Sequence, residues 1–285
     1  MKNKTYKTNK AGVLRRFTEL ALVLLVCLVC LSGCGKKKAE EDALVIDSLP
    51  MTDASASQPA ADGPEEGQPS PDAAEQTPEP VFATEEEREL HQAYSYLFGT
   101  GGVRADYSAA VKLYRPLAEG GDPEAQFYMG YVYEYGYGVT RDLKAAFDWY
   151  SSAAAGGSSA AMINIGKLYE YGDGVEQDYM TAIAWYKTAV SAGNVSATTN
   201  LGWMYQNGKG VTQDDEAAFD WYMMGANAGN VTAMRFVGWM YYYGKGVQQS
   251  DAAAKDWLQK AADGGDVAGA YLLKAIDSDN TDMGY

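Results

Sequence analysis

Apolar positions in the C-terminal part of the chain follow the period of an α-helix. Ala125, Met129, Val132 and Tyr133 recur at the spacing i, i+4, i+7 and i+8, which places them on one face of a helix. The face is wide enough to be buried against a neighbouring element. We therefore expect an amphipathic helix here, and the same spacing returns at Ala161, Ile165, Leu168 and Tyr169.

A second helix is predicted after each of these. Ala146, Trp149, Tyr150 and Ala153 lie at helical spacing, and Asp142 precedes them where an N-cap is wanted. Glycines between the two helices supply the left-handed backbone conformations that end a helix. The predicted N-caps are Asp142, Asp178 and Asp214, and the loop glycines are Gly136 and Gly138, Gly172 and Gly174, Gly208 and Gly210, and Gly244 and Gly246.

The helix pair repeats with a period of 36 residues. A ladder of glycines in the first helix, Gly130, Gly166, Gly202 and Gly238, keeps step with Trp149, Trp185, Trp221 and Trp257 in the second. A fixed period of this size is typical of stacked helix pairs, each of which buries its apolar face on the next. The predicted units are 123–158, 159–194, 195–230 and 231–266, with a weaker copy at 87–122 and a closing helix at 267–277.

The pattern resembles the Sel-one-like repeat, a relative of the tetratricopeptide repeat. Its elements are Ala-x-x-x-Leu/Met-Gly-x-x-Tyr, Gly-x-Gly-Val and Ala-x-x-Trp-Tyr-x-x-Ala, and the resemblance covers residues 87–277. It implies an all-α fold, a right-handed α-solenoid of about five helix-turn-helix repeats. The first copy departs from the pattern, with Tyr94 at the ladder glycine, Leu113 at the tryptophan and Thr100 at the first loop glycine.

The N-terminus combines a basic start with a short apolar run. Six Lys or Arg residues precede an apolar core at 20–31, followed by Leu31-Ser32-Gly33-Cys34. Twelve helical residues span roughly 18 Å, short of the ~30 Å hydrocarbon thickness, so a cleaved signal peptide at 1–33 is expected rather than a membrane-spanning helix. The alternative is a short uncleaved anchor with buried cysteines.

The sequence Leu-Ser-Gly-Cys resembles the lipobox of bacterial lipoproteins. The resemblance implies a diacylglyceryl thioether on Cys34 and acylation, such as palmitate, of the new amine. Two or three acyl chains suffice for stable anchoring. Gly35 stands where an Asp would resemble an inner-membrane retention signal. We therefore expect an exported, lipid-anchored protein, on the outer membrane of a two-membraned cell or otherwise on the outer face of the cytoplasmic membrane.

Residues 35–85 are polar, acidic and rich in proline, which predicts a disordered linker between Cys34 and the repeat domain at 86–277, with a tail at 278–285. After residue 34 the chain holds 17 Lys and Arg against 37 Asp and Glu, and residues 86–285 hold 14 against 25. With no basic stripe to neutralise phosphates, nucleic acid is excluded as a partner. Membrane contact is expected only through the lipid anchor.

Candidate chemistry in the repeats is sparse. His91 is the only histidine, and all three cysteines precede residue 35. No transition-metal cluster and no catalytic triad can be written from these residues, so neither a metal site nor a cofactor is expected. The adjacent acids at 214–216 fit the start of a helix, where the dipole favours negative charge. The sequence therefore indicates a binding protein and not an enzyme.

Positions that vary between repeats are the candidates for partner contact. By analogy with tetratricopeptide repeats, positions −3, +1, +4 and +5 from the ladder glycine should line the concave groove. Aromatic rings beside amides and single charges are used in peptide and glycan recognition. These positions hold Phe127, Tyr131, Glu134 and Tyr135; Ile163, Lys167, Glu170 and Tyr171; Thr199, Trp203, Gln206 and Asn207; and Arg235, Trp239, Tyr242 and Tyr243.

Ten of these residues are selected as candidate contacts for a partner. The expected partner is an unidentified protein or peptide held by an adaptor or scaffold, and the alternative is an envelope glycan such as peptidoglycan. A further alternative is that the rings pack against the neighbouring second helix. The ten are Phe127, Tyr131, Tyr135, Lys167, Tyr171, Trp203, Asn207, Arg235, Trp239 and Tyr243.

Overall fold

The structure, a computed structural model, describes residues 82–282, with side chains up to residue 277. The predicted signal segment, Cys34 and nearly all of the predicted linker lie outside these residues. The described part contains helices and no strand. The helices are α3 (Glu85–Phe98), α4 (Tyr107–Glu119), α5 (Pro123–Tyr135), α6 (Leu143–Ala155), α7 (Ser159–Tyr171), α8 (Tyr179–Ser191), α9 (Ala197–Gln206), α10 (Asp215–Asn227), α11 (Val231–Tyr243), α12 (Asp251–Asp263) and α13 (Val267–Asp282).

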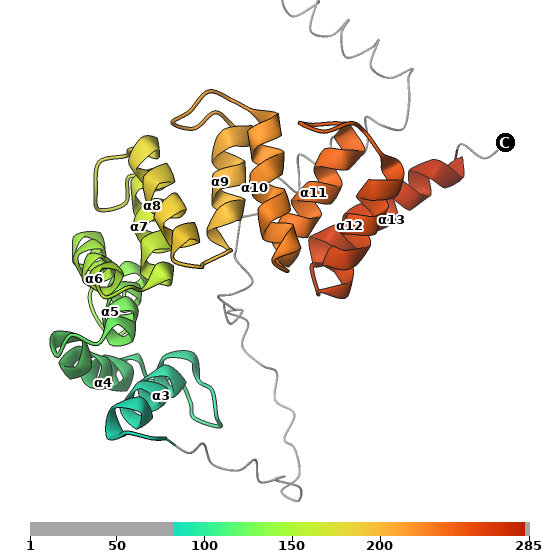
Figure 1. Cartoon of the computed structure of the whole chain (residues 1–285). Coiled ribbons are helices and arrows are strands. Elements are labelled where there is room, and N and C mark those ends of the chain that lie inside the picture. Colours follow the sequence, from blue (N-terminus) through green and yellow to red (C-terminus); the bar gives the residue numbers. More distant parts are fainter. Residues whose placement is uncertain (1–81, 283–285) are drawn as a thin grey trace, which may run out of the picture. The chain divides into compact units, whose positions relative to one another are not determined.

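Residues 82–273 belong to one compact unit, in which consecutive helices lie side by side as antiparallel pairs (Figure 1). Within the repeats, α5 packs on α6, α7 on α8, α9 on α10 and α11 on α12. Between repeats, the second helix of one packs on the first helix of the next, as α6 does on α7 and α8 on α9. The predicted all-α solenoid is thereby confirmed, since each helix pair contacts its neighbours along the row.

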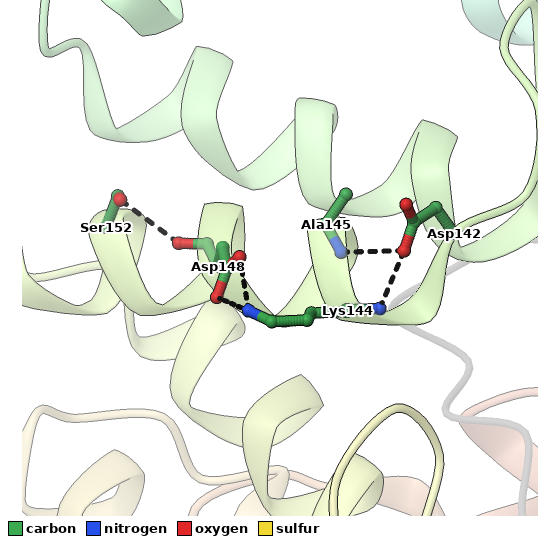
Figure 2. A network of polar contacts seen from close by, with 5 residues as sticks. All are labelled: Asp142, Lys144, Ala145, Asp148 and Ser152. Carbon is green, nitrogen blue, oxygen red and sulfur yellow. Dashed lines mark hydrogen bonds and ion pairs between the residues drawn. The ribbon is translucent and has the colours of Figure 1, made fainter.

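The predicted N-caps are confirmed. The carboxylate of Asp142 accepts hydrogen bonds from the backbone N–H groups of Lys144 and Ala145, both at 3.0 Å (Figure 2). Such a cap satisfies donors that the first turn leaves unpaired and is worth about 1 kcal/mol. Asp178 and Asp214 cap α8 and α10 in the same way, and Asp122, Ser158 and Asn230, which the sequence analysis did not name, cap α5, α7 and α11.

The first repeat departs from the others in its turn. Gly99, and not Thr100, adopts the left-handed conformation that ends the first helix. The N–H of Asp106 then bonds to the carbonyl of Tyr96, ten residues earlier, whereas Asp142 reaches back nine residues to Tyr133. The connection is therefore one residue longer, and a fixed 36-residue alignment misplaces the helix. Aligned by their C-caps, Gly99 and Gly136, the helices place the fully buried Ala93, rather than Tyr94, at the ladder position.

The ladder glycines allow the two helices of a repeat to approach closely. A Cβ atom at Gly166 would lie 2.5 Å from Cε1 of Tyr186, and a Cβ at Gly202 would lie equally close to Tyr222. Both tyrosines are fully buried. Each ladder tryptophan directly precedes the buried residue of the second helix that faces the ladder glycine. The tryptophan itself stays partly exposed while it packs against the hydrophobic core. The tryptophans are therefore packing residues, as predicted, but at the rim of the core.

Candidate binding face

The +4 position of the first helices belongs to the interior. The hydroxyl of Tyr150 donates a 2.6 Å hydrogen bond to Oε2 of Glu134, and Tyr186 donates one of 2.6 Å to Glu170. Burial raises the pKa of both carboxyls, and the hydrogen bond from the tyrosine only partly opposes this rise. Gln206 accepts the corresponding bond from Tyr222 at 2.9 Å. These positions, which the sequence analysis placed in the groove, instead join the two helices of a repeat.

The −3 position is also engaged within the molecule. Phe127 is half-buried, with its ring centre 5.1 Å from Tyr128 and 5.7 Å from Tyr150. Arg235 forms an ion pair with Asp266, with Nε 3.2 Å from Oδ2, and both side chains are largely buried. Phe127 and Arg235 therefore have intramolecular partners, and Ile163 at the equivalent position is buried.

The +5 position is the most exposed of the four, and the +1 position lies one helical turn before it. The exposed fraction is 63% at Tyr171 and 44% at Tyr135, while the residues at +1 are half-buried. Since these positions recur on successive first helices, the solenoid places them in one row. We call the following eight residues the helix-A row: Tyr131, Tyr135, Lys167, Tyr171, Trp203, Asn207, Trp239 and Tyr243.

Two tryptophans occupy the C-terminal half of the helix-A row. Trp203 packs on the central hydrophobic cluster, and Trp239 packs on the cluster formed by α10 and α11. The ring of Trp239 also lies 5.0 Å from that of Tyr243. Asn207 is exposed, and its side-chain amide donates to the carbonyl of Trp203 at 2.9 Å. The large rings are therefore held in place by packing while part of each stays accessible.

Tyrosines dominate the N-terminal half of the row. Tyr131 lies 4.7 Å from Tyr135 and 5.9 Å from Tyr137, measured between ring centres. Tyr137 in turn stacks on Tyr107 at 4.6 Å. Burial raises the pKa of Tyr131, and it raises that of Tyr135 to about 12, so the rings carry no charge at neutral pH. The sequence analysis missed Tyr107 and Tyr137, although an aromatic residue between two loop glycines was a readable signal.

Lys167 interacts electrostatically with two interior carboxyl groups. It is half-buried, and its positive charge lowers the pKa of both Glu134 and Glu170, against the larger effect of their burial. The positive charge of Lys167 therefore acts on the interior carboxyl groups, while part of its side chain stays exposed at the surface.

The second helices carry a different surface. Together, residues 142–155, 178–191, 214–227 and 250–263 contain ten Asp and Glu against four Lys and Arg. Many of these groups are satisfied locally: Asp142 caps α6, and Lys144 pairs with Asp148 at 2.9 Å one turn further on (Figure 2). Ion pairs this exposed contribute little to stability. The second helices therefore present an acidic, solvated surface, and their ladder tryptophans stay partly exposed at its border with the core.

Among the residues that the structure describes, no three His, Cys, Asp or Glu side chains are grouped to hold a metal ion. None of the described helices combines the length and apolar content that crossing a membrane needs.

The repeats match a known family model. Five consecutive segments fit the Sel1 repeat, at residues 93–122, 123–158, 159–194, 195–230 and 231–266. The chain belongs to the Sel1 repeat family. The first match begins at Ala93, the residue that the C-cap Gly99 aligns with the ladder glycine. Sel1 repeats generally serve as protein-interaction modules, and their fold is typically a non-catalytic scaffold.

Two solved Sel1 structures are similar to this chain. One is a Sel1 repeat protein from Oxalobacter formigenes, with 34% identity and a TM-score of 0.61 over 65% of this chain and 75% of that one. The other is a protective antigen present in uropathogenic Escherichia coli strains, with 33% identity and a TM-score of 0.59 over 66% of this chain and 40% of that one. The chain thus spans less than half the length of the second protein. A comparison with curated proteins gave no match.

Proposed function

We propose that this protein is an exported, membrane-anchored adaptor that binds a protein or peptide partner through the helix-A row. The observation that carries the proposal is a half-exposed ring, held by packing, at the same position of the first helices α5, α9 and α11: Tyr131, Trp203 and Trp239. Rings of this kind supply large contact area at low entropic cost, and they dominate the binding energy of protein interfaces.

The distribution of charge also supports the helix-A row as the binding face. Ionised side chains are strongly hydrated and are depleted at the centres of interfaces, where aromatic residues are enriched. The four second-helix segments hold ten acidic and four basic residues, whereas the +1 and +5 positions of the first helices hold only one charged residue, Lys167. An interface centred on the helix-A row therefore requires less desolvation of charge than one centred on the second helices.

A pull-down from detergent-solubilised membranes tests the binding face. The variants are Trp203→Ala/Trp239→Ala and, as a control, Met180→Ala/Met224→Ala, which removes two exposed apolar side chains from second helices. We expect the tryptophan variant to lose a partner that the wild type and the control retain. Removal of an anchoring ring from an interface costs about 2 kcal/mol or more, a loss of at least tenfold in affinity.

The same experiment separates a protein partner from a glycan. Retention of the wild type on purified cell wall, lost in the tryptophan variant, would assign the row to an envelope glycan instead. If both variants keep every bound component of the wild type, the row is not the binding face.

Anchoring through Cys34 is a separate part of the proposal and rests on the sequence alone. The short apolar run and Leu-Ser-Gly-Cys support cleavage before Cys34 and its lipidation. We expect Cys34→Ala to prevent both steps, which leaves an unlipidated protein of larger apparent mass. Lipid labelling and normal processing in that variant would contradict the proposed anchor.

A further inference from the structure

Charge is unevenly divided along the first helices. The first-helix and loop segments of the last two complete repeats, 195–213 and 231–249, contain three Lys or Arg residues and no Asp or Glu. The corresponding segments 123–141 and 159–177 contain five acidic residues and two basic ones. In a chain of net charge −15, two successive first-helix and loop segments without an acid form a local exception, although the loop at Gly246 packs on the backbone of Asp215 and Glu216 at the start of α10.

Two of these three cations occupy one structural position. Lys209 and Lys245 each lie between the two left-handed glycines of the loop after a first helix. Their backbone N–H groups bond to the carbonyls of Met204 at 2.9 Å and Met240 at 3.0 Å, so the two loops share one geometry. The equivalent residue is Asp173 in the preceding repeat, which shows that the lysine is not required by the turn.

Each lysine follows the tryptophan of the preceding first helix by six residues, in the loop at the end of that helix. First helices α9 and α11 contact each other directly, so the two repeats present a continuous surface. The Nζ atom of Lys209 lies 5.4 Å from the ring centre of Tyr179, and Lys245 is exposed. Arg235, the third cation, is paired with Asp266 and contributes no net charge. We call the following six residues the Trp–Lys patch: Trp203, Asn207, Lys209, Trp239, Tyr243 and Lys245.

We propose that the Trp–Lys patch binds an acidic, extended segment of a partner protein. Lysine ammonium groups pair with carboxylates, the two tryptophan rings receive apolar or aromatic side chains between them, and the amide of Asn207 is placed at the same surface. The acidic second helices repel such a segment elsewhere on the domain, which confines it to this patch. This inference rests on the proposed function, because it names the chemistry of the partner at the same face.

The charge of the repeats favours a partner over the chain's own acidic linker. The described chain begins at the first repeat, where the ring of Phe82 lies 5.0 Å from that of His91 on α3. The patch lies on α9 and α11, three and four repeats further along the solenoid. Two repeats lie between the first repeat and α9, and their first-helix and loop segments hold five acidic residues, which would repel an acidic linker segment that extended along the row to the lysines.

Selection from a random-sequence peptide library against the full chain in detergent tests the proposal. We expect the recovered peptides to be enriched in Asp and Glu, and to bind more weakly as salt is raised. Their affinity should fall by about tenfold or more for Lys209→Glu/Lys245→Glu. The control is Lys144→Glu/Lys260→Glu, which makes the same charge change on second helices, and Lys209→Gln/Lys245→Gln gives a weaker loss without charge reversal.

The outcomes separate this inference from the proposed function. Peptides that require Trp203 and Trp239 but show no acidic enrichment would overturn the acidic specificity and leave the binding face standing. Peptides that bind equally to Trp203→Ala/Trp239→Ala would contradict both. Two results would assign the patch to another occupant: salt-sensitive self-association that Lys209→Glu/Lys245→Glu abolishes, or tenfold tighter peptide binding after deletion of residues 40–79.

Discussion

The hydroxyl of Tyr150 lies 2.6 Å from Oε2 of Glu134 and donates a hydrogen bond to it across the two helices of one repeat. The pair recurs as Tyr186 with Glu170 and Tyr222 with Gln206. Because a buried polar group is costly when it is left unpaired, each pair fixes the second helix at one register on the first. The surface rows of the solenoid depend on this register.

We expect Tyr150→Phe to destabilise the repeat domain. The substitution removes the hydrogen bond that Tyr150 donates to the partly buried Glu134 carboxyl, which costs about 1–3 kcal/mol. Tyr114→Phe is the matched control, since the buried hydroxyl of Tyr114 has no hydrogen-bond partner in the described part of the chain. Its removal should change stability by less than about 0.5 kcal/mol. Urea denaturation measures both, and equal losses would contradict the role given to the pair.

Glu134→Gln should change how stability depends on pH. Burial raises the pKa of the Glu134 carboxyl in the folded state above its ordinary value, so the folded state binds more protons than the unfolded one between those two pKa values. Stability from this group therefore falls as pH rises through that window. A glutamine side chain does not titrate, so it adds no pH dependence to stability. Its carbonyl oxygen can accept the hydrogen bond from Tyr150, as Gln206 accepts one from Tyr222.

The measurement is the difference in unfolding free energy between Glu134→Gln and wild type at acidic and at neutral pH. We expect the difference to shift in favour of the variant as pH rises. Glu176→Gln, at an exposed position in a loop, is the control and should show no comparable shift. A difference that moves the opposite way would mean that Glu134 is stabilised as the anion.

Gly166→Ala should destabilise by overpacking. Its Cβ would lie 2.5 Å from Cε1 of the buried Tyr186, so the ring or the helix must move, at about 1–3 kcal/mol. Combined with Tyr186→Ala, the same substitution no longer meets the ring. The two losses should therefore not add, and a double-mutant cycle from thermal or urea unfolding measures the difference. Additive losses would show that the glycine matters for another reason.

Much of the fold was predictable because the repeat multiplies each signal. The helix faces, the caps at Asp142, Asp178 and Asp214, and the all-α solenoid follow from local patterns that recur every 36 residues. The first repeat was placed less well, because one extra loop residue shifts Ala93 and Gly99 out of the fixed period. A single copy offers no second occurrence by which such a shift can be recognised.

The candidate face was predictable only in part. Polar residues at the +4 position look like surface groups in the sequence, and only the packing shows that Glu134 and Glu170 accept bonds from buried tyrosines. Arg235 looked available for a partner until its pairing with Asp266, a residue 31 positions away, was seen. Contacts within a single repeat decide both cases, and they depend on how its helices pack, which composition does not reveal.

Site-specific photo-crosslinking tests the central claim most directly. A photo-reactive phenylalanine analogue at Tyr171 reports on the helix-A row, and the same analogue at Met180 reports on a second helix with similar exposure, 63% and 71%. In cells or solubilised membranes, we expect a crosslinked partner from position 171 and none from position 180. A partner captured only from position 180 would contradict the assignment of binding to the helix-A row.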